Sequence, residues 1–227
     1  MEPENQNDNI LKGYNMLLYF AGTMLIYEPS EECIADFWTN DILKKLPVSS
    51  SNANFIKAAS QLRDSCADKT MCGNLMREDY IRLFTNNGKP LAPPLESFYR
   101  NNGLINSGYT PSSSTDFYNS YGWKSKFKAN IKDDHLAIEL LFLTRLIDKY
   151  LALDDIPCRL EMGIEIRRFI DNHILSWVPE WNRKIQLYSK TLNFKGIGTL
   201  ILACTEDIFS LFDPDSSFGF LKKSLKN

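Results

Sequence analysis

The sequence predicts an all-α protein, a single helical bundle domain of about nine to ten helices. Three observations favour this class. Apolar residues recur at three- and four-residue steps in several long segments, which is the spacing of one face of a helix. Residues that start or stop helices, such as proline, serine, aspartate and glycine, stand between these segments. No segment alternates apolar and polar residues as a half-buried strand does.

The N-terminal helical part is expected over residues 8–84. Apolar spacing predicts a first helix over Ile10–Tyr27. Pro29 as a break, Ser30 as a cap and two first-turn glutamates predict a second helix that ends near Leu46. A serine-rich linker leads into a third helix over Asn54–Ala67. A short helix over Arg77–Phe84 ends at an Asn-Asn-Gly stop signal.

A long hinge loop is predicted near residues 85–132, because prolines, glycines and asparagines are dense there. A helix over Ser113–Tyr121 lies inside it. Long loops within a compact domain often carry function. The C-terminal helical part, residues 133–212, contains helices over Asp133–Leu153 and Pro157–Leu175, one that begins at Pro179, and a last one. The last helix is expected over Asn193–Phe212. One buried stripe of the helix over Asp133–Leu153 comprises Leu136, Leu140, Leu143, Ile147 and Tyr150.

Composition excludes several classes of protein. The 227 residues are 44% hydrophobic and 24% charged, as in an ordinary soluble domain. The net charge of −2 gives no sign of the basic surface that a nucleic-acid-binding protein needs. The longest early apolar run, residues 16–27, is shorter than the ~20 residues of a membrane span and follows acidic residues rather than a basic leader region. We therefore expect a cytoplasmic protein without membrane insertion.

The five cysteines are scattered and form no CxxC pair, which argues against a disulfide framework and for a reducing compartment. Cys33, Cys158 and Cys204 fall within helical patterns, where a thiol acts as a small hydrophobe. His135 and His173 are the two histidines, and neither has ligand spacing to a cysteine. We therefore expect no metal site.

The pair Asp134-His135 opens the strongly apolar helix that follows it and has two interpretations. An acidic residue, Asp133 or Asp134, is expected to cap the helix, and Glu139 faces His135 from one turn away. The alternative is a small helical hydrolase in which Asp134 or Glu139 orients His135 as a general base. No G-x-S-x-G nucleophile motif or cysteine-protease signature accompanies the pair. Gly196 and Gly198 form no phosphate-binding motif, and close helix packing explains them better.

Two further stretches carry large aromatic groups. His173 shares a helix face with apolar residues, so it is expected at the edge of a core, and Trp177 follows one turn later as core or as a peptide-binding ledge. In the loop, Pro93-Pro94 fixes an extended segment. Its large apolar neighbours either plug the loop onto the body or line a groove, and Glu96 is an acidic recognition candidate. These neighbours are Leu95, Phe98 and Tyr99.

Four motifs, in order along the chain, resemble the TorD/DmsD family of redox-enzyme maturation chaperones. They are a Tyr-x-x-Leu-Phe helix, a Pro-Pro loop ending in Ser-x-Tyr, an Asp-His-x-x-x-Glu-Leu helix and a Phe-x-x-x-His block that ends in tryptophan. Leu95 stands where many members of the family carry an aromatic residue. The motifs are carried by Tyr80, Leu83, Phe84, Pro93, Pro94, Ser97, Tyr99, Asp134, His135, Glu139, Leu140, Phe169, His173, Ile174 and Trp177.

The resemblance implies a cytoplasmic chaperone without enzymatic activity or cofactor. Its partner would be a molybdopterin-containing oxidoreductase precursor, bound through its twin-arginine signal peptide or its apo form. The chaperone would assist cofactor insertion and prevent premature export; monomer and homodimer both stay open. The expected client-binding set is Tyr80, Phe84, Pro93, Pro94, Leu95, Glu96, Ser97, Tyr99, Asp134, His135, Glu139, His173 and Trp177.

Overall fold

The structure, a computed structural model, is all-α as predicted. It describes residues 3–30, 45–65, 69–100, 112–126 and 131–213. Across these ranges the chain forms no extended strand, only one isolated bridge pair. No helix within the described ranges combines the length and the apolar character needed to cross a membrane.

The described part of the chain forms the following helices, in chain order. They are α1 (Pro3–Ile26), α3 (Ala53–Arg63), α4 (Lys69–Tyr80), the π-helix η1 (Ile81–Thr85), the 3₁₀-helix η2 (Asn86–Gly88), α5 (Glu96–Arg100), α6 (Ser112–Ser120), α7 (Leu136–Leu151), α8 (Ile156–Ile170), the π-helix η3 (Asp171–Leu175), α9 (Val178–Tyr188) and α10 (Leu192–Leu211).

Most predicted helices occur close to their predicted positions, with three differences. The helix predicted over Arg77–Phe84 begins earlier, at Lys69, because packing of the buried Met76 outweighs the low helix propensity of the glycine in that stretch. The predicted hinge loop contains a short helix, α5, which was not predicted because five residues are too few to show a periodic pattern. The second predicted helix, which follows Ser30 and ends near Leu46, falls mostly outside the described residues.

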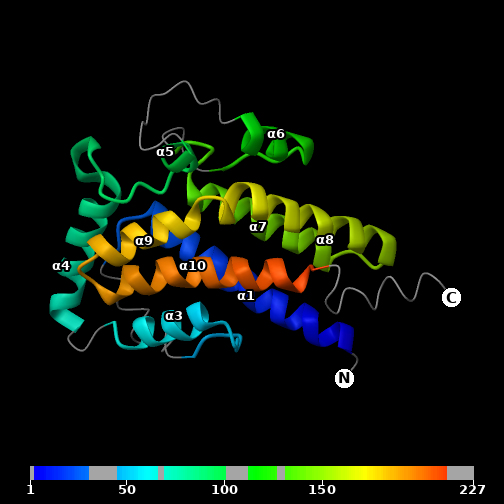
Figure 1. Cartoon of the computed structure of the whole chain (residues 1–227), viewed down its shortest axis with the longest axis horizontal. Helices are drawn as coiled ribbons and strands as arrows, with labels where there is room; N and C mark the ends of the chain where they lie inside the picture. Colours follow the sequence, from blue (N-terminus) through cyan, green and yellow to red (C-terminus); the bar gives the residue numbers. More distant parts are fainter. Residues whose placement is uncertain (1–2, 31–44, 66–68, 101–111, 127–130, 214–227) are drawn as a thin grey trace.

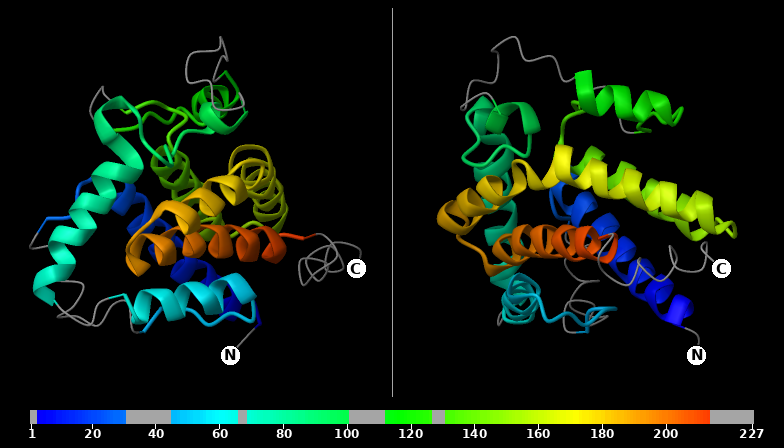
Figure 2. Two further views of the ribbon diagram at one scale, coloured as in Figure 1. Left: turned by 60° about the vertical axis from the view of Figure 1, so that its left-hand side comes forward. Right: turned by 45° about the vertical axis from the view of Figure 1, so that its right-hand side comes forward.

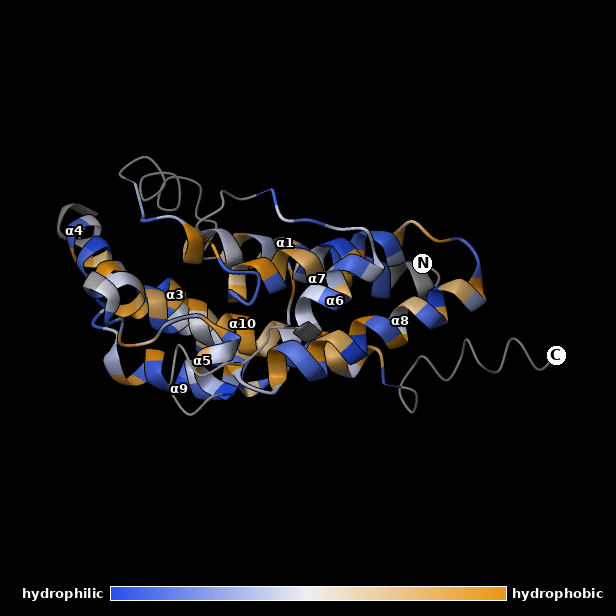
Figure 3. Cartoon of the chain, turned by 90° about the horizontal axis from the view of Figure 1, so that it is seen from above, coloured by the Kyte–Doolittle hydropathy of each residue, from blue (hydrophilic) through white to orange (hydrophobic). Residues whose placement is uncertain are grey.

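Helix α10 runs through the middle of the bundle. It packs against α1, α3, α8 and α9, while α7 packs against α1 and α8 (Figure 1). Helix α4 crosses one end of the bundle, and α6 lies on the outside near α7 and α8 (Figure 2). Most residues of α10 are buried, and the part of this helix that is visible in Figure 3 is hydrophobic, whereas α9 carries both hydrophobic and polar residues. The central position of α10 thus follows from its apolar composition.

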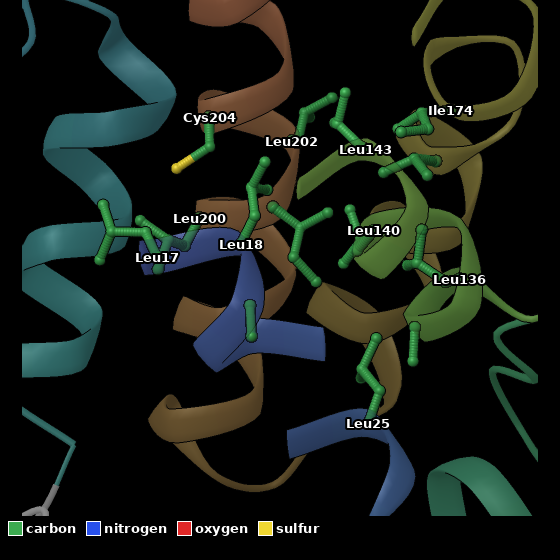
Figure 4. Packing of buried hydrophobic residues seen from close by; sticks show 14 of the residues in the cluster. Leu17, Leu18, Leu25, Leu136, Leu140, Leu143, Ile174, Leu200, Leu202 and Cys204 are labelled. Carbon is green, nitrogen blue, oxygen red and sulfur yellow. The ribbon is translucent and has the colours of Figure 1, made fainter. Parts of the chain in front are cut away.

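The core forms where α1, α7 and α10 meet (Figure 4). Leu18 of α1 and Leu140 of α7 are fully buried there. The stripe predicted on α7 is confirmed, since all five of its members are buried. Cys204 of α10 belongs to the core as predicted, but Cys158 is exposed at the start of α8, so its interpretation as a buried hydrophobe was wrong.

Close helix packing at Gly196 leads to a stability prediction. A Cβ atom at this position would lie 2.7 Å from the Leu62 Cγ of α3, so Gly196→Ala is expected to lower the free energy of unfolding by about 1–3 kcal/mol. Gly22→Ala in α1 is the matched control, because its nearest neighbour would lie at an ordinary 3.6 Å. The control is expected to gain about 0.5–1 kcal/mol from helix propensity. Urea unfolding of both variants checks the two opposite signs; equal losses would contradict the packing argument.

A buried carboxylate, Asp79 of α4, connects this helix with the turn between α9 and α10. Its Oδ2 accepts hydrogen bonds from Ser189 Oγ at 2.7 Å and from the Thr191 amide at 2.9 Å. Its Oδ1 accepts from Arg82 Nη2 at 2.6 Å. Thr191 is the N-cap of α10, so Asp79 ties α4 to the turn that starts the central helix.

Candidate functional site

Two segments distant in sequence pair side by side at the start of α7. The Leu136 amide donates to the Pro94 carbonyl at 2.9 Å, and the Glu96 amide donates to the Asp134 carbonyl at 3.0 Å. Between these bonds, Leu95 and His135 form the isolated antiparallel bridge. The pairing brings the Pro-Pro loop and the Asp-His motif into one place, where the sequence had only suggested that both were functional.

Asp134 and His135 each cap a different helix. The Asp134 Oδ2 accepts from the Ser97 amide at 3.0 Å, at the start of α5. His135 is the N-cap of α7, and its Nδ1 accepts from the Ala137 amide at 3.1 Å. The expectation that an aspartate caps α7 was therefore wrong, because the backbone pairing directs the Asp134 carboxylate to α5 and leaves the cap to the histidine.

Three acidic side chains are buried beside this pairing. Glu96 and Glu139 are 0% exposed and Asp134 is 2% exposed. Arg100 reaches back one turn of α5, and its Nε lies 2.9 Å from the Glu96 Oε1. The Nδ1 of His173, contributed by η3, lies 3.4 Å from both Glu96 oxygens. We call these five residues the acidic cluster.

The surroundings of Glu139 favour its protonated form. Burial raises the pKa of Glu139 well above its usual value, and the charges of Glu96 and Asp134 and a hydrogen bond with Glu96 raise it further. Neither Glu139 oxygen accepts a hydrogen bond from a donor in the described part of the chain. A protonated Glu139 that donates to Glu96 accounts for both observations. The spacing of Glu139 from His135 allowed a bond between them, but the His135 Nδ1 accepts from the Ala137 amide instead.

The geometry gives no support to His135 as a general base. Burial lowers the pKa of His135 to about 4, although the charge of Asp134 acts in the opposite direction. The imidazole is therefore neutral near pH 7 and weakly basic, and its Nδ1 lone pair accepts the helix cap. No group of histidine, cysteine and acidic side chains suited to a metal ion occurs in the residues that the structure describes.

An aromatic pair lies next to the acidic cluster. The rings of Tyr99 and Trp177 stack with centroids 5.3 Å apart, and the Trp177 indole Nε1 donates to the His173 carbonyl at 2.6 Å. The ammonium group of Lys184 lies 4.6 Å from the ring of Phe98 and 5.3 Å from that of Tyr99. Phe98 and Tyr99 are half-buried, so they pack onto the body while keeping part of their surface in water.

Tyr80 and Phe84 belong to a different aromatic cluster. The ring centroid of Phe84 in η1 lies 5.2 Å from that of Tyr80 and 5.4 Å from that of Phe194 in α10. The Tyr80 hydroxyl donates to the Ile26 carbonyl at 3.0 Å. The buried Pro93-Pro94 segment connects this cluster with the acidic one. The predicted set thus gathers in two neighbouring places rather than around a single pocket.

Sequence reasoning missed three residues of the site. Arg100 carried a signal, since it stands four residues after Glu96 within one helical stretch. Tyr118 of α6 donates to the Asp133 carbonyl at 3.0 Å, and burial together with the Glu139 and Glu96 charges raises the pKa of this phenol. Lys184 had no signal, because its aromatic partners come from another helix.

Comparisons with known proteins agree with the four motifs. A family model described as nitrate reductase delta subunit matches residues 50–183, which include the whole expected client-binding set. The chaperone protein TorD of Vibrio cholerae is 22% identical over 191 residues, covering 82% of this chain and 86% of that protein. TorD of Vibrio vulnificus is 29% identical over 143 residues, 62% of this chain and 63% of that protein. TorD of a Psychrobacter species is 26% identical over 125 residues, 55% and 56% of the two chains.

Proposed function

Because the chain belongs to the nitrate reductase delta subunit family and is a redox-enzyme maturation chaperone of the TorD/DmsD type, we propose that it binds the twin-arginine signal peptide of a molybdopterin-containing oxidoreductase precursor in the cytoplasm. Holding the precursor would allow cofactor insertion before export. The acidic cluster at the junction of α5 and α7 is the proposed contact for the arginine pair.

The observation that carries the proposal is the ion pair between Glu96 and Arg100. In this pair, a carboxylate of the acidic cluster already binds a guanidinium group of the chain itself. Arg100 also donates to Ser176 Oγ at 2.8 Å and to the Asn172 carbonyl, so the surroundings offer further acceptors for guanidinium nitrogens. Carboxylates bind arginine through paired, charge-assisted hydrogen bonds. A leader arginine that enters the cluster would take the place of Arg100.

The apolar part of a leader peptide needs an adjoining apolar surface. Phe98 and Tyr99 provide partly exposed rings next to Arg100 in the sequence, and the buried Trp177 stacks on Tyr99. Tyr80 and Phe84 lie at the other end of the Pro93-Pro94 segment and would serve a longer peptide that follows this segment.

Calorimetry with a synthetic twin-arginine leader from a molybdoenzyme of the source organism tests the proposal. We expect saturable binding that weakens at least about tenfold when lysines replace the arginine pair, because lysine cannot make the paired contacts. Glu96→Gln and Asp134→Asn are expected to weaken binding by a similar factor. Arg100→Gln is expected to tighten it, since the internal competitor is gone.

The control variant is Glu161→Gln, which removes an exposed carboxylate on α8. Its affinity for the leader is expected to match that of the unmodified chain. Circular dichroism and melting temperature show whether each variant is folded. Absence of leader binding by the unmodified chain, or equal binding by the Glu96→Gln variant, would remove the basis for the proposal.

A further inference from the structure

A cavity of about 120 Å³ lies between the turn after α6 and α7, and none of its lining residues belongs to the acidic cluster. Tyr121, Trp123 and Phe142 form its aromatic walls, and Arg145 and Lys149 line it together with Gly122 and Leu146. Phe142, Arg145 and Lys149 follow one another at three- and four-residue steps, so α7 presents them as one stripe. None of these residues belongs to the expected client-binding set.

The turn after α6 builds the aromatic wall. Gly122 has a φ of +59°, a left-handed conformation that suits glycine, and the Trp123 amide donates back to the Tyr118 carbonyl at 2.9 Å. This turn returns the Trp123 ring to α7, where its centroid lies 5.3 Å from that of Phe142. The cavity is therefore shaped by a specific backbone turn, not by surface side chains alone.

The cavity is positively charged although the chain as a whole carries −2. The Lys149 ammonium lies 4.8 Å from the centre of the Tyr121 ring. Arg145 is exposed and has no hydrogen bond or ion pair within the described ranges of the chain. No acidic residue lines the cavity, and Glu165, which accepts from the Tyr121 hydroxyl at 3.4 Å, is already paired with Arg168 at 2.7 Å. The lining thus offers a guanidinium with unused donors.

We propose that this cavity binds a residue-sized carboxylate, with the carboxylate on Arg145 and its apolar body against Tyr121 and Trp123. The volume suits a ligand of about the size of one residue, because cavities of roughly 150 Å³ hold a single benzene ring. Arginine binds carboxylates through two parallel hydrogen bonds, and aromatic walls favour a flat or apolar body. The carboxylate belongs either to a free small acid or to an acidic side chain of a polypeptide.

The indole N–H signal of Trp123, assigned by its loss in Trp123→Phe, gives a direct readout in NMR spectra of the full chain. Benzoate serves as the free-acid probe and a doubly blocked glutamate as the peptide probe, with benzamide and blocked glutamine as neutral matches. We expect a saturable shift with at least one acid and at least about tenfold weaker binding of its neutral match. The acid that binds more tightly identifies the source of the carboxylate.

Arg145→Gln is expected to weaken binding of the acid at least about tenfold, because the paired hydrogen bonds are lost. The matched control, Arg63→Gln, removes an exposed arginine on α3 and is expected to bind like the unmodified chain. Equal affinities for an acid and its neutral match, no shift with either acid, or undiminished binding by a folded Arg145→Gln variant would overturn the assignment. No probe contains arginine, so the outcome is independent of leader binding.

Discussion

Asp79→Asn is expected to lower the free energy of unfolding by about 3–5 kcal/mol, the range for breaking a buried charged network. The side chain is 1% exposed and accepts hydrogen bonds from Arg82, Ser189, Thr191 and the Lys190 amide. An asparagine keeps one acceptor oxygen but turns an NH₂ group toward donors that are themselves buried. Urea unfolding measures the loss, and a change within about 0.5 kcal/mol would contradict the anchoring role.

The loss at Asp79 is also expected to depend on pH. Burial by itself would raise the pKa of Asp79, but hydrogen bonds from Ser189, Arg82 and two backbone amides outweigh burial and lower it below 3.8. A lowered pKa contributes stability above the unfolded pKa that is lost as pH falls through the folded value. The difference between the unmodified chain and the variant should therefore shrink below about pH 4. Asp64→Asn, on the exposed surface of the chain, is the control and should change stability little.

Glu139→Gln is expected to stabilise the protein increasingly as pH rises. Burial and the neighbouring Glu96 and Asp134 charges raise the pKa of Glu139, so the folded state keeps a proton that the unfolded state releases above its ordinary pKa of about 4.5. A raised pKa gives stability that is complete below the unfolded value and is lost as pH rises toward the folded one. Glutamine keeps the neutral donor to Glu96 and removes this loss.

Melting temperatures measured from pH 5 to pH 9 test the Glu139 prediction. The stability gap between Glu139→Gln and the unmodified chain should widen by on the order of 1 kcal/mol per pH unit until Glu139 ionises in the folded state. Glu161→Gln, which changes an exposed glutamate on α8, should run parallel to the unmodified chain. If the Glu139→Gln curve also ran parallel, no proton would be held in the acidic cluster.

The long helices were predictable because their signals are local. The apolar stripe of α7 and the proline near the start of α8 each depend on residues within a few turns, and α7, α8 and α10 all occur near their predicted positions. The α5 helix spans five residues, too few for a periodic pattern, and was missed. Boundaries shifted where packing between distant segments decided them, as at the start of α4.

The candidate site was predictable in its residue types but not in its partnerships. Spacing along one helix paired Glu139 with His135, whereas burial brings Glu139 to Glu96, more than forty positions earlier in the chain. The acidic cap was assigned to α7 for the same reason, because the pairing with Leu95 could not be seen locally. Arg100 was missed for a related reason: its spacing of four residues from Glu96 is a signal only once α5 is known to be helical, and its bonds to Ser176 and Asn172 come from a distant segment.

The short pairing of Leu95 with His135 has a consequence for how this family can vary. It holds the two ends of the sequence that runs from Ser97 to Asp133 side by side. A longer sequence between these ends would raise the entropic cost of loop closure by only about 0.6 kcal/mol for each doubling of its length. Insertions within this sequence are therefore compatible with an unchanged pairing of Leu95 with His135. We expect chains that differ in length between Ser97 and Asp133 to keep Asp134, Glu139 and His173 in the same places.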